Sequence, residues 1–190
     1  MKNKKWIIIG VIALVVVILV GAVAGGYNSL VTAQTNVETA QANIQTQLQR
    51  RADLIPNFVS TVKGYANYEQ ETFTAVTEAR ASVGKAGDAA SLSEAQQKLD
   101  GAISLWVNAV TESYPDLKAN SNFIALQDEL AGTENRIAVA RKDYNTAAQQ
   151  YNTFIRRFPK NILAGIFGFE KVNYFEADNG TSSVPNVSFE

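Results

Sequence analysis

The stretch from Phe123 to Phe158 reads FIALQDELAGTENRIAVARKDYNTAAQQYNTFIRRF and carries an aromatic or aliphatic residue at every seventh position. This first row consists of Phe123, Leu130, Ile137, Tyr144, Tyr151 and Phe158. A second row consists of Leu126, Ala140, Ala147 and Phe154, with Thr133 as its exception. Two apolar rows at this spacing are typical of a helix that packs one face in a bundle. The stretch therefore predicts one long helix, which Pro159 ends.

The same spacing occurs earlier in the chain, between Tyr27 and Val83. Asp53 is a suitable cap for a helix that starts at Leu54, with Pro56 in its first turn. We therefore predict two helices, 27–51 and 54–83; a single kinked helix is the alternative, because the pattern stays in phase across Pro56. One row contains Leu30, Val37, Ile44, Phe58 and Tyr65 and is interrupted by Arg51, and the other contains Leu48, Ile55, Val62 and Val76.

A linker of mostly small residues, 84–90, precedes the next predicted helix. Ser91-Leu92-Ser93-Glu94 has the spacing of a capping box. Four helices that each carry one apolar stripe bury those stripes best in an up-down-up-down arrangement. We predict an antiparallel four-helix bundle over 27–177 and a polar, disordered tail over 178–190. The third helix has one apolar face, formed by Leu92, Leu99, Ile103, Trp106 and Val110, and ends at Tyr114-Pro115-Asp116.

An uncharged apolar run extends from Trp6 to Ala24. A helix of this length rises about 28 Å, close to the roughly 30 Å of a bilayer's hydrocarbon core. A secretory signal peptide cleaved near Ala24 is the alternative, but the run is longer than a typical signal core. The predicted fold is therefore all-α: a short basic segment over 1–5, a transmembrane helix over 6–26 and then the bundle.

The distribution of positive charge predicts the orientation of this anchor. Lys2, Lys4 and Lys5 precede the apolar run, and the next basic residue is Arg50. Positive charges near a span favour the cytoplasmic side. We expect a single-pass protein of the cell membrane that contacts the bilayer through 6–26, with a cytoplasmic N-terminus and an extracytoplasmic bundle.

The composition excludes several classes of chemistry. The chain contains neither His nor Cys, so Ser-His-Asp triads, imidazole or thiolate zinc sites and disulfides are impossible. Seventeen basic against eighteen acidic residues argue against a nucleic-acid binder. No nucleophile motif or glycine-rich loop is present. We expect no reaction, no cofactor, no metal and no small-molecule ligand.

Several short blocks of sequence together resemble one known family. With these blocks, which are spread over most of 27–177, the chain resembles the LemA family of bacterial membrane proteins. The resemblance implies an N-terminal anchor followed by a helical bundle, and it supplies no reaction. Phe58 stands where the family often has Leu, and Tyr68 where it often has His. The blocks are RRADLIPN (50–57), VKGY (62–65), YPDLKAN (114–120), GTENRI (132–137), RKDYN (141–145), YN (151–152), FP (158–159), FGF (167–169) and YFEA (174–177).

Eleven residues within or beside these blocks are candidates for interaction or structural motifs. Arg50, Arg51 and Asp53 could form a binding corner. We favour Asp53 as a helix cap and the two arginines as solvated or intrahelical ion-pair residues. The candidates are Arg50, Arg51, Asp53, Pro56, Tyr114, Pro115, Asn135, Arg136, Arg141, Tyr144 and Asn145.

Other polar residues of the long helix allow two interpretations each. The carboxylates Asp128, Glu129, Glu134 and Asp143 lack the Glu-x-x-His motif of a metal-binding bundle, so we expect them on the solvated surface. Asn145 and Asn152 each follow a tyrosine of the first row and either form hydrogen bonds across the bundle or are exposed. The tyrosines in the apolar rows, with Tyr27, are expected in the core with their hydroxyls on polar partners.

The last apolar segment, 161–169, is too short to span a membrane. It follows Arg156, Arg157 and Lys160, which the fourth pass of the bundle returns towards the bilayer. The segment therefore either enters the membrane interface or closes the core. The leading hypothesis for function is a membrane-tethered interaction or scaffold module at the bacterial cell envelope. A secreted or shed helical domain and a carboxylate- or Ser-Lys-based enzyme are the alternatives.

Overall fold

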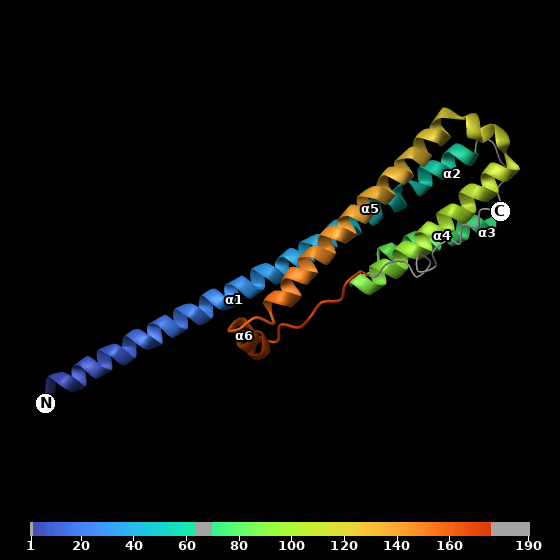
Figure 1. Ribbon diagram of the computed structural model, residues 1–190. Helices are drawn as coiled ribbons and strands as arrows, with labels where there is room; N and C mark the ends of the chain where they lie inside the picture. Colours follow the sequence, from blue (N-terminus) through green and yellow to red (C-terminus); the bar gives the residue numbers. More distant parts are fainter. Residues whose placement is uncertain (1, 64–69, 176–190) are drawn as a thin grey trace, which may run out of the picture. The chain divides into compact units, whose positions relative to one another are not determined.

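The computed structural model describes residues 2–63 and 70–175, and within these residues every regular element is a helix (Figure 1). The predicted all-α fold is confirmed. Tyr65, Tyr68 and the tail over 178–190 lie outside the described residues. The elements are α1 (Lys2–Asp53), α2 (Ile55–Lys63), α3 (Gln70–Val83), α4 (Ala89–Ser113), the 3-10 helix η1 (Pro115–Ala119), α5 (Ser121–Phe154) and α6 (Lys160–Phe167).

The chain divides into two compact units. The anchor unit combines Met1–Ala40 with Thr146–Val172, and the bundle unit combines Gln41–Asn145 with Asn173–Glu190. Helices α1 and α5 each contribute residues to both units.

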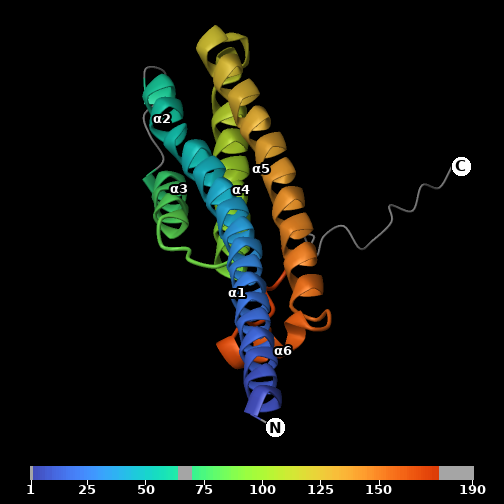
Figure 2. The same ribbon diagram turned by 90° about the vertical axis from the view of Figure 1, so that its left-hand side faces the viewer.

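Four helical passes form the bundle unit: the end of α1 with α2, then α3, α4 and α5 (Figure 2). The Phe58 ring of α2 makes edge-to-face contacts with Trp106 of α4 and Phe123 of α5, with centroids 5.7 and 5.6 Å apart. Such ring pairs add stability beyond their buried area. Arg80 of α3 pairs with Asp53 of α1 at 3.1 Å. Side chains from all four passes meet, as the predicted antiparallel bundle requires.

The first bundle pass is interrupted next to Pro56. Helix α1 ends at Asp53, Leu54 forms a turn, and α2 starts at Ile55 with Pro56 in its first turn. The missing N–H of a proline has no cost in a first turn, and α1 and α2 are separate helices, as predicted. They nevertheless form one pass of the bundle. The predicted single helix over 54–83 is wrong, because α2 and α3 belong to different passes (Figure 2). The expected cap differs. Asp53 belongs to α1, and its carboxylate accepts hydrogen bonds from Gln49 and Arg80.

The capping box of α4 lies three residues earlier than predicted. The Ser91 N–H donates to Asp88 Oδ1 at 2.7 Å, and the Asp88 N–H donates to Ser91 Oγ at 3.0 Å. Glu94, the expected partner of Ser91, instead pairs with Lys98 at 2.7 Å. The backbone N–H of Ser91, and then its hydroxyl, lower the pKa of Asp88. Asp and Ser are equally good N-cap residues, so a helix that starts after Asp88 satisfies the backbone N–H groups of its first turn as well as one that starts after Ser91.

The end of the long helix also differs from the prediction. Helix α5 ends at Phe154, and Phe158 is exposed beyond it. In the second predicted row, Ala147 and Phe154 are only half-buried near this end, and their neighbours Ala148 and Ile155 are buried instead, whereas Tyr151 of the first row stays buried. A seven-residue row drifts by about 20° per repeat on a helix of 3.6 residues per turn. After several repeats the buried stripe has moved on by one position.

The anchor unit contains an apolar stretch that no described part of the chain covers. Large apolar side chains from Trp6 to Val23 are exposed. Among the described residues, α1 alone is long and apolar enough to cross a membrane. A transmembrane anchor and a signal peptide share this property. In the same unit α6 packs one face inward: Ala164 is buried, whereas Ile162 is exposed. Tyr27, expected in the core, is 38% exposed.

Candidate functional site

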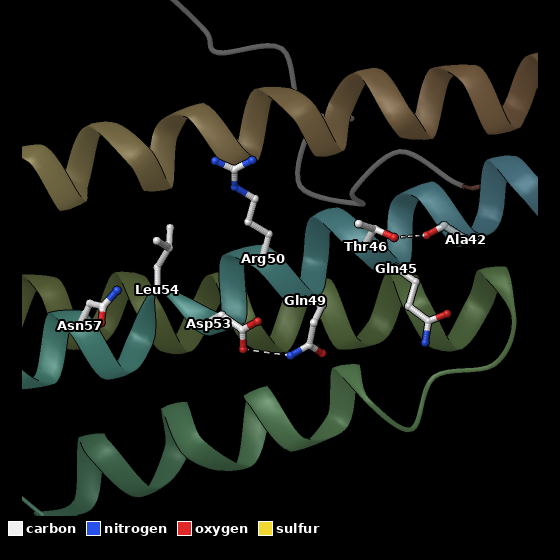
Figure 3. Close-up of a pocket in the computed structure, with 8 residues that line it drawn as sticks. All are labelled: Ala42, Gln45, Thr46, Gln49, Arg50, Asp53, Leu54 and Asn57. Atoms are coloured by element: carbon white, nitrogen blue, oxygen red, sulfur yellow. Dashed lines mark hydrogen bonds between the residues drawn. The ribbon is translucent and has the colours of Figure 1, made fainter.

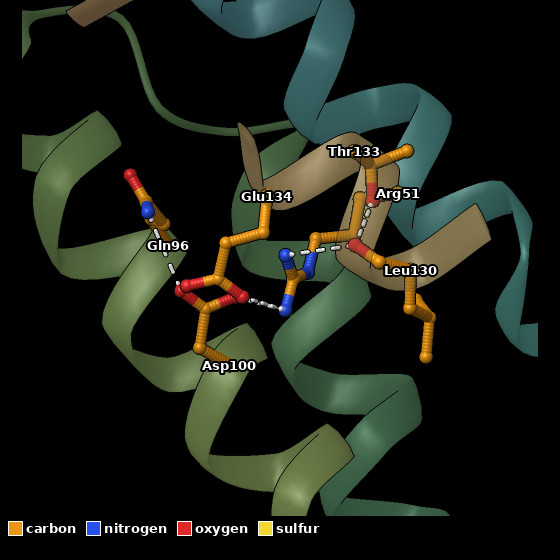
Figure 4. A network of polar contacts seen from close by, with 6 residues as sticks. All are labelled: Arg51, Gln96, Asp100, Leu130, Thr133 and Glu134. Atoms are coloured by element: carbon orange, nitrogen blue, oxygen red, sulfur yellow. Dashed lines mark hydrogen bonds and ion pairs between the residues drawn. The ribbon is translucent and has the colours of Figure 1, made fainter. Parts of the chain in front are cut away.

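A buried arginine, Arg51, forms the centre of a polar network in the bundle unit (Figure 4). Arg51 is only 4% exposed. Its Nη2 donates to Glu134 Oε2 at 3.0 Å and lies 3.1 Å from Asp100 Oδ1, although without hydrogen-bond geometry to that oxygen. Its Nη1 lies 3.5 Å from the Leu130 carbonyl. One guanidinium therefore joins α1, α4 and α5.

The burial of Arg51 explains why it needs partners on other helices. A buried charge without partners is very unfavourable, and the planar guanidinium can serve several acceptors at once. Gln96 donates to Asp100 Oδ2 at 3.3 Å and so stabilises the second carboxylate. The prediction that Arg51 is solvated or paired within its own helix is wrong, because its place in the apolar row turns it inward.

Arg51 and Thr133 each interrupt a predicted apolar row, and both side chains reach the same backbone oxygen. The Thr133 hydroxyl is buried and donates to the Leu130 carbonyl at 2.7 Å, the carbonyl that Arg51 also reaches. A polar residue in an apolar row was thus the signal for this network. Gln96 carries the same signal, because it lies seven residues before Ile103 on the apolar face of its helix. Asp100 carries none, and Glu134, expected on the solvated surface, is exposed but paired.

The neighbouring Arg50 has a different environment. Its side chain is exposed, as predicted, and donates to Glu129 Oε1 at 2.9 Å. Arg136 donates to the same oxygen at 2.7 Å. The partner of Arg50 therefore lies on α5 and not on its own helix, which corrects the intrahelical part of the prediction. Glu129, expected on the solvated surface, is half-buried between two guanidinium groups.

A shallow groove of about 690 Å³ lies along an exposed face of α1 and α2 (Figure 3). Within it, Gln49 donates to Asp53 at 3.0 Å and the Thr46 hydroxyl donates to the Ala42 carbonyl at 2.8 Å. Its two charged groups have partners outside the groove, because Arg50 pairs with Glu129 and Asp53 with Arg80. The lining residues recur at helical spacing, and we call them the polar stripe: Ala42, Gln45, Thr46, Gln49, Arg50, Asp53, Leu54 and Asn57.

Side-chain amides of α5 hold the extended segment after α6. In the bundle unit, Asn145 Nδ2 donates to the Phe175 carbonyl at 3.0 Å, and Asn145 Oδ1 accepts from the Phe175 N–H at 2.8 Å. In the anchor unit, Asn152 forms the same pair of bonds with Val172, at 2.9 and 3.0 Å. An asparagine amide offers one donor and one acceptor, as a peptide group does. Both asparagines form hydrogen bonds, but their partner is the backbone of the segment after α6 and not another helix of the bundle, as one interpretation had expected.

Two residues beside Asn145 complete its contact with this segment. The Tyr144 hydroxyl donates to the Asn173 carbonyl at 2.9 Å, and its ring meets the Phe175 ring edge-to-face at 5.1 Å. The Arg141 guanidinium lies 5.7 Å from the centre of the Phe175 ring. Burial, and then the charge of Asp88, raise the pKa of Tyr144. Tyr144 is thus a core residue whose hydroxyl has a polar partner, as predicted.

The remaining predicted residues do not join the Arg51 network. Tyr114 ends α4, and its N–H donates to the Val110 carbonyl at 2.9 Å. Pro115 is the first residue of η1, where its missing N–H is harmless. Asn135 is exposed on α5. These residues have structural positions at helix ends or on the surface.

The fold and these contacts define a class of protein. It is an all-α bundle stabilised by buried or half-buried polar contacts, with an N-terminal apolar helix long enough to span a membrane. A sequence model of the LemA family matches residues 40–189. The chain belongs to the LemA family.

Three relatives have comparable similarity. The chain is 29% identical to magnetosome protein MamQ 2 of Paramagnetospirillum magneticum and 27% identical to MamQ of Magnetospirillum gryphiswaldense. These alignments cover 79% and 78% of this chain and 64% of each relative, so the chain spans less than two thirds of their length. It is also 29% identical to protein LemA of Metamycoplasma hominis, over 80% of this chain and 70% of the relative.

Proposed function

We propose that this protein is a single-pass membrane protein whose helical bundle acts as a scaffold for protein partners at the bacterial cell envelope, without a reaction of its own. The observation that carries the proposal is the exposed apolar stretch of α1, which belongs to the same helix as the first pass of the bundle. Apolar side chains that nothing in the described chain covers favour a bilayer. A bundle that begins in that helix favours a role at the membrane.

The polar stripe is the partner surface that we propose. Its side chains are mainly amides and a hydroxyl, and its Arg50 and Asp53 already have ion-pair partners. Such a surface favours a protein segment that forms hydrogen bonds with amides rather than one that brings a strong opposite charge. We therefore expect binding that depends little on salt, in contrast to a charge-steered contact.

The orientation can be tested by cysteine labelling, because the chain contains no natural cysteine. We propose that the N-terminus is cytoplasmic and the bundle extracytoplasmic. A membrane-impermeant maleimide added to intact cells should label the Lys142→Cys variant and not the Asn3→Cys variant. Labelling of Asn3→Cys alone would reverse the topology. The mass of the protein recovered from membranes tests the alternative of cleavage near Ala24.

The partner surface can be tested by photo-crosslinking in cells. A photoreactive amino acid replaces Gln45 in the polar stripe, and a matched variant carries it at Val139, which is exposed on α5. We expect a discrete protein adduct from position 45 and none from position 139. Thr46→Arg, which introduces bulk and charge into the stripe, should abolish the adduct. The same adducts from both positions, or an adduct that survives Thr46→Arg, would contradict the proposed surface.

A further inference from the structure

Helix α6 presents apolar side chains on the face that does not pack inward. Ile162 is 52% exposed and Ile166 is 69% exposed, and residues four apart lie on one face of a helix. Phe158, just before the helix, is 81% exposed. On the opposite side Ala164 is buried. An apolar group of this size in water is unfavourable, so this face is suited to an apolar environment.

Helix α6 is seated next to the end of the apolar stretch of α1. Leu163 lies so close to Gly26 that a Cβ atom on Gly26 would overlap the Leu163 side chain. Tyr27 makes edge-to-face contacts with Phe167 and Phe169, with centroids 4.8 and 5.8 Å apart. The apolar run ends only two residues before Gly26, so α6 lies where a bilayer spanned by α1 would end. Aromatic residues are enriched at this level of membrane proteins.

Gly168 explains how both aromatic residues reach Tyr27. Its φ of 74° is in the left-handed region, and it ends α6. The Phe169 N–H then bonds back to the Ala164 carbonyl at 2.9 Å. This is the usual end of a helix at glycine, and it returns the chain towards α1. The contact of α6 with α1 is therefore made by Leu163 in the middle of the helix and by the aromatic residues at its C-terminal end.

The segment around α6 is positively charged. Arg156 and Arg157 are exposed, and the Lys160 Nζ lies 3.3 Å from the centre of the Phe154 ring. With Lys171 these residues make four positive charges, against Glu170 as the only acidic residue from 154 to 171. Apolar residues flanked by basic residues are the pattern of helices that lie in the interface of anionic membranes.

We propose that α6 is an interfacial helix that inserts Phe158, Ile162 and Ile166 into the leaflet boundary beside α1, with Arg156 and Arg157 on anionic head groups. This inference rests on the anchor of the proposed function and adds a second, distinct lipid contact. The occupant of the exposed face is lipid and not a protein, because the face adjoins the uncovered apolar surface of α1 and is bordered by positive charge.

The test uses the full chain in vesicles of phosphatidylethanolamine and phosphatidylglycerol. Single-cysteine variants at Val16, Asn161, Ile166 and Lys142 carry an environment-sensitive fluorophore, and spin-labelled lipids act as quenchers at known depth. We expect lipid quenching at position 166 to be at least about fivefold stronger than at position 142. Position 161 should be quenched less than position 166. The fluorophore at position 16 should lie deepest in the bilayer. Arg156→Glu with Arg157→Glu should reduce quenching at position 166 in these vesicles and not in phosphatidylcholine.

Each other outcome has a distinct meaning. Quenching at position 16 but not at position 166 overturns the interfacial helix and leaves the anchor intact. No quenching at position 16 overturns the anchor, and the inference with it. A fluorophore at position 166 that is shielded from lipid quenchers and from aqueous iodide indicates a protein contact and overturns the assignment to lipid. Equal quenching at positions 161 and 166 overturns the orientation of the helix.

Discussion

The Asn145 side chain forms two hydrogen bonds with the backbone of Phe175, one through its amide nitrogen at 3.0 Å and one through its oxygen at 2.8 Å. The partner is a segment about thirty residues away in the chain. An asparagine side chain offers one donor and one acceptor, as a peptide group does, so the Asn145 side chain satisfies both backbone groups of Phe175 at once.

Asn145→Asp should weaken this contact, since a carboxylate cannot donate to the Phe175 carbonyl. We expect a loss of about 1 to 3 kcal/mol in the free energy of unfolding, the usual cost of leaving a partly buried polar group unpaired. Urea unfolding of the full chain in detergent measures it. Asn135→Asp is the matched control, because Asn135 is exposed on the same helix. Equal losses of unfolding free energy in the two variants would contradict a specific contact between Asn145 and Phe175.

The adjacent arginines Arg50 and Arg51 should differ strongly when each is replaced by alanine. Arg51→Ala removes a buried cation from Glu134 and Asp100, and breaking such a pair costs about 3 to 5 kcal/mol. Because Glu134 is largely exposed and can regain water, we expect a loss near 3 kcal/mol. Arg50→Ala removes an exposed pair, which contributes about 1 kcal/mol or less.

Arg51→Met separates charge from packing in the same unfolding experiment. The methionine side chain fills much of the space of the arginine stem but cannot serve the carboxylates. We expect its stability to lie between those of wild type and Arg51→Ala. A loss for Arg50→Ala as large as that for Arg51→Ala would show that burial of Arg51 does not govern its contribution.

Local patterns predicted the helices and failed to predict the pairings between them. Apolar spacing identified the helical stretches because burying one face of a helix requires a repeat that is visible within one segment. It did not show that α2 and α3, predicted as one helix, belong to different passes. Arg51 was misassigned because its partners Asp100 and Glu134 lie far away in the sequence, on other helices. The burial of Arg51 followed from its row, but the choice of partner depends on how the helices are packed.

Two smaller errors have local causes. The cap of α4 was placed on Ser91 because Ser-x-x-Glu fits the box, yet Asp88-x-x-Ser91 offers the same exchange one turn earlier. The last repeat of α5 was extended to Phe158 because a strict seven-residue row ignores the drift of an α-helix. Both errors concern helix ends, where several neighbouring residues can satisfy the same backbone groups.

The buried row of α5 provides a test of the bundle core. Ile137 is fully buried, so Ile137→Ala should remove packed methyl groups and cost about 2 to 5 kcal/mol. Val139, two residues further on, is exposed, and Val139→Ala should change stability by about 0.5 kcal/mol or less. Thermal unfolding followed by far-UV circular dichroism compares them. An unchanged melting point for Ile137→Ala would contradict the register of α5.

Alkaline pH should destabilise the folded chain through its buried tyrosines. Burial raises the pKa of Tyr144, with the charge of Asp88 as a second cause, and burial also raises the pKa of Tyr151, with Glu38 and Glu170 adding to it. The unfolded chain therefore ionises first, near the ordinary tyrosine pKa of about 10. Stability from these groups is fully present below that pH and is lost as the pH rises towards the folded pKa values.

The Tyr144→Phe variant removes one of these two titrating hydroxyls and so measures its share of the pH dependence. Between the unfolded and folded pKa values, each such tyrosine binds one more proton in the folded state, so stability falls by about 1.4 kcal/mol per pH unit. Removing the hydroxyl should reduce the slope by that amount above pH 10, while the lost bond to Asn173 costs about 0.5 to 1.5 kcal/mol at neutral pH. Urea unfolding at a series of pH values, with phenolate absorbance as a second probe, measures both effects. Parallel stability curves for wild type and Tyr144→Phe above pH 10 would mean that Tyr144 ionises in the folded chain as readily as in the unfolded one, and would contradict its burial against the C-terminal segment.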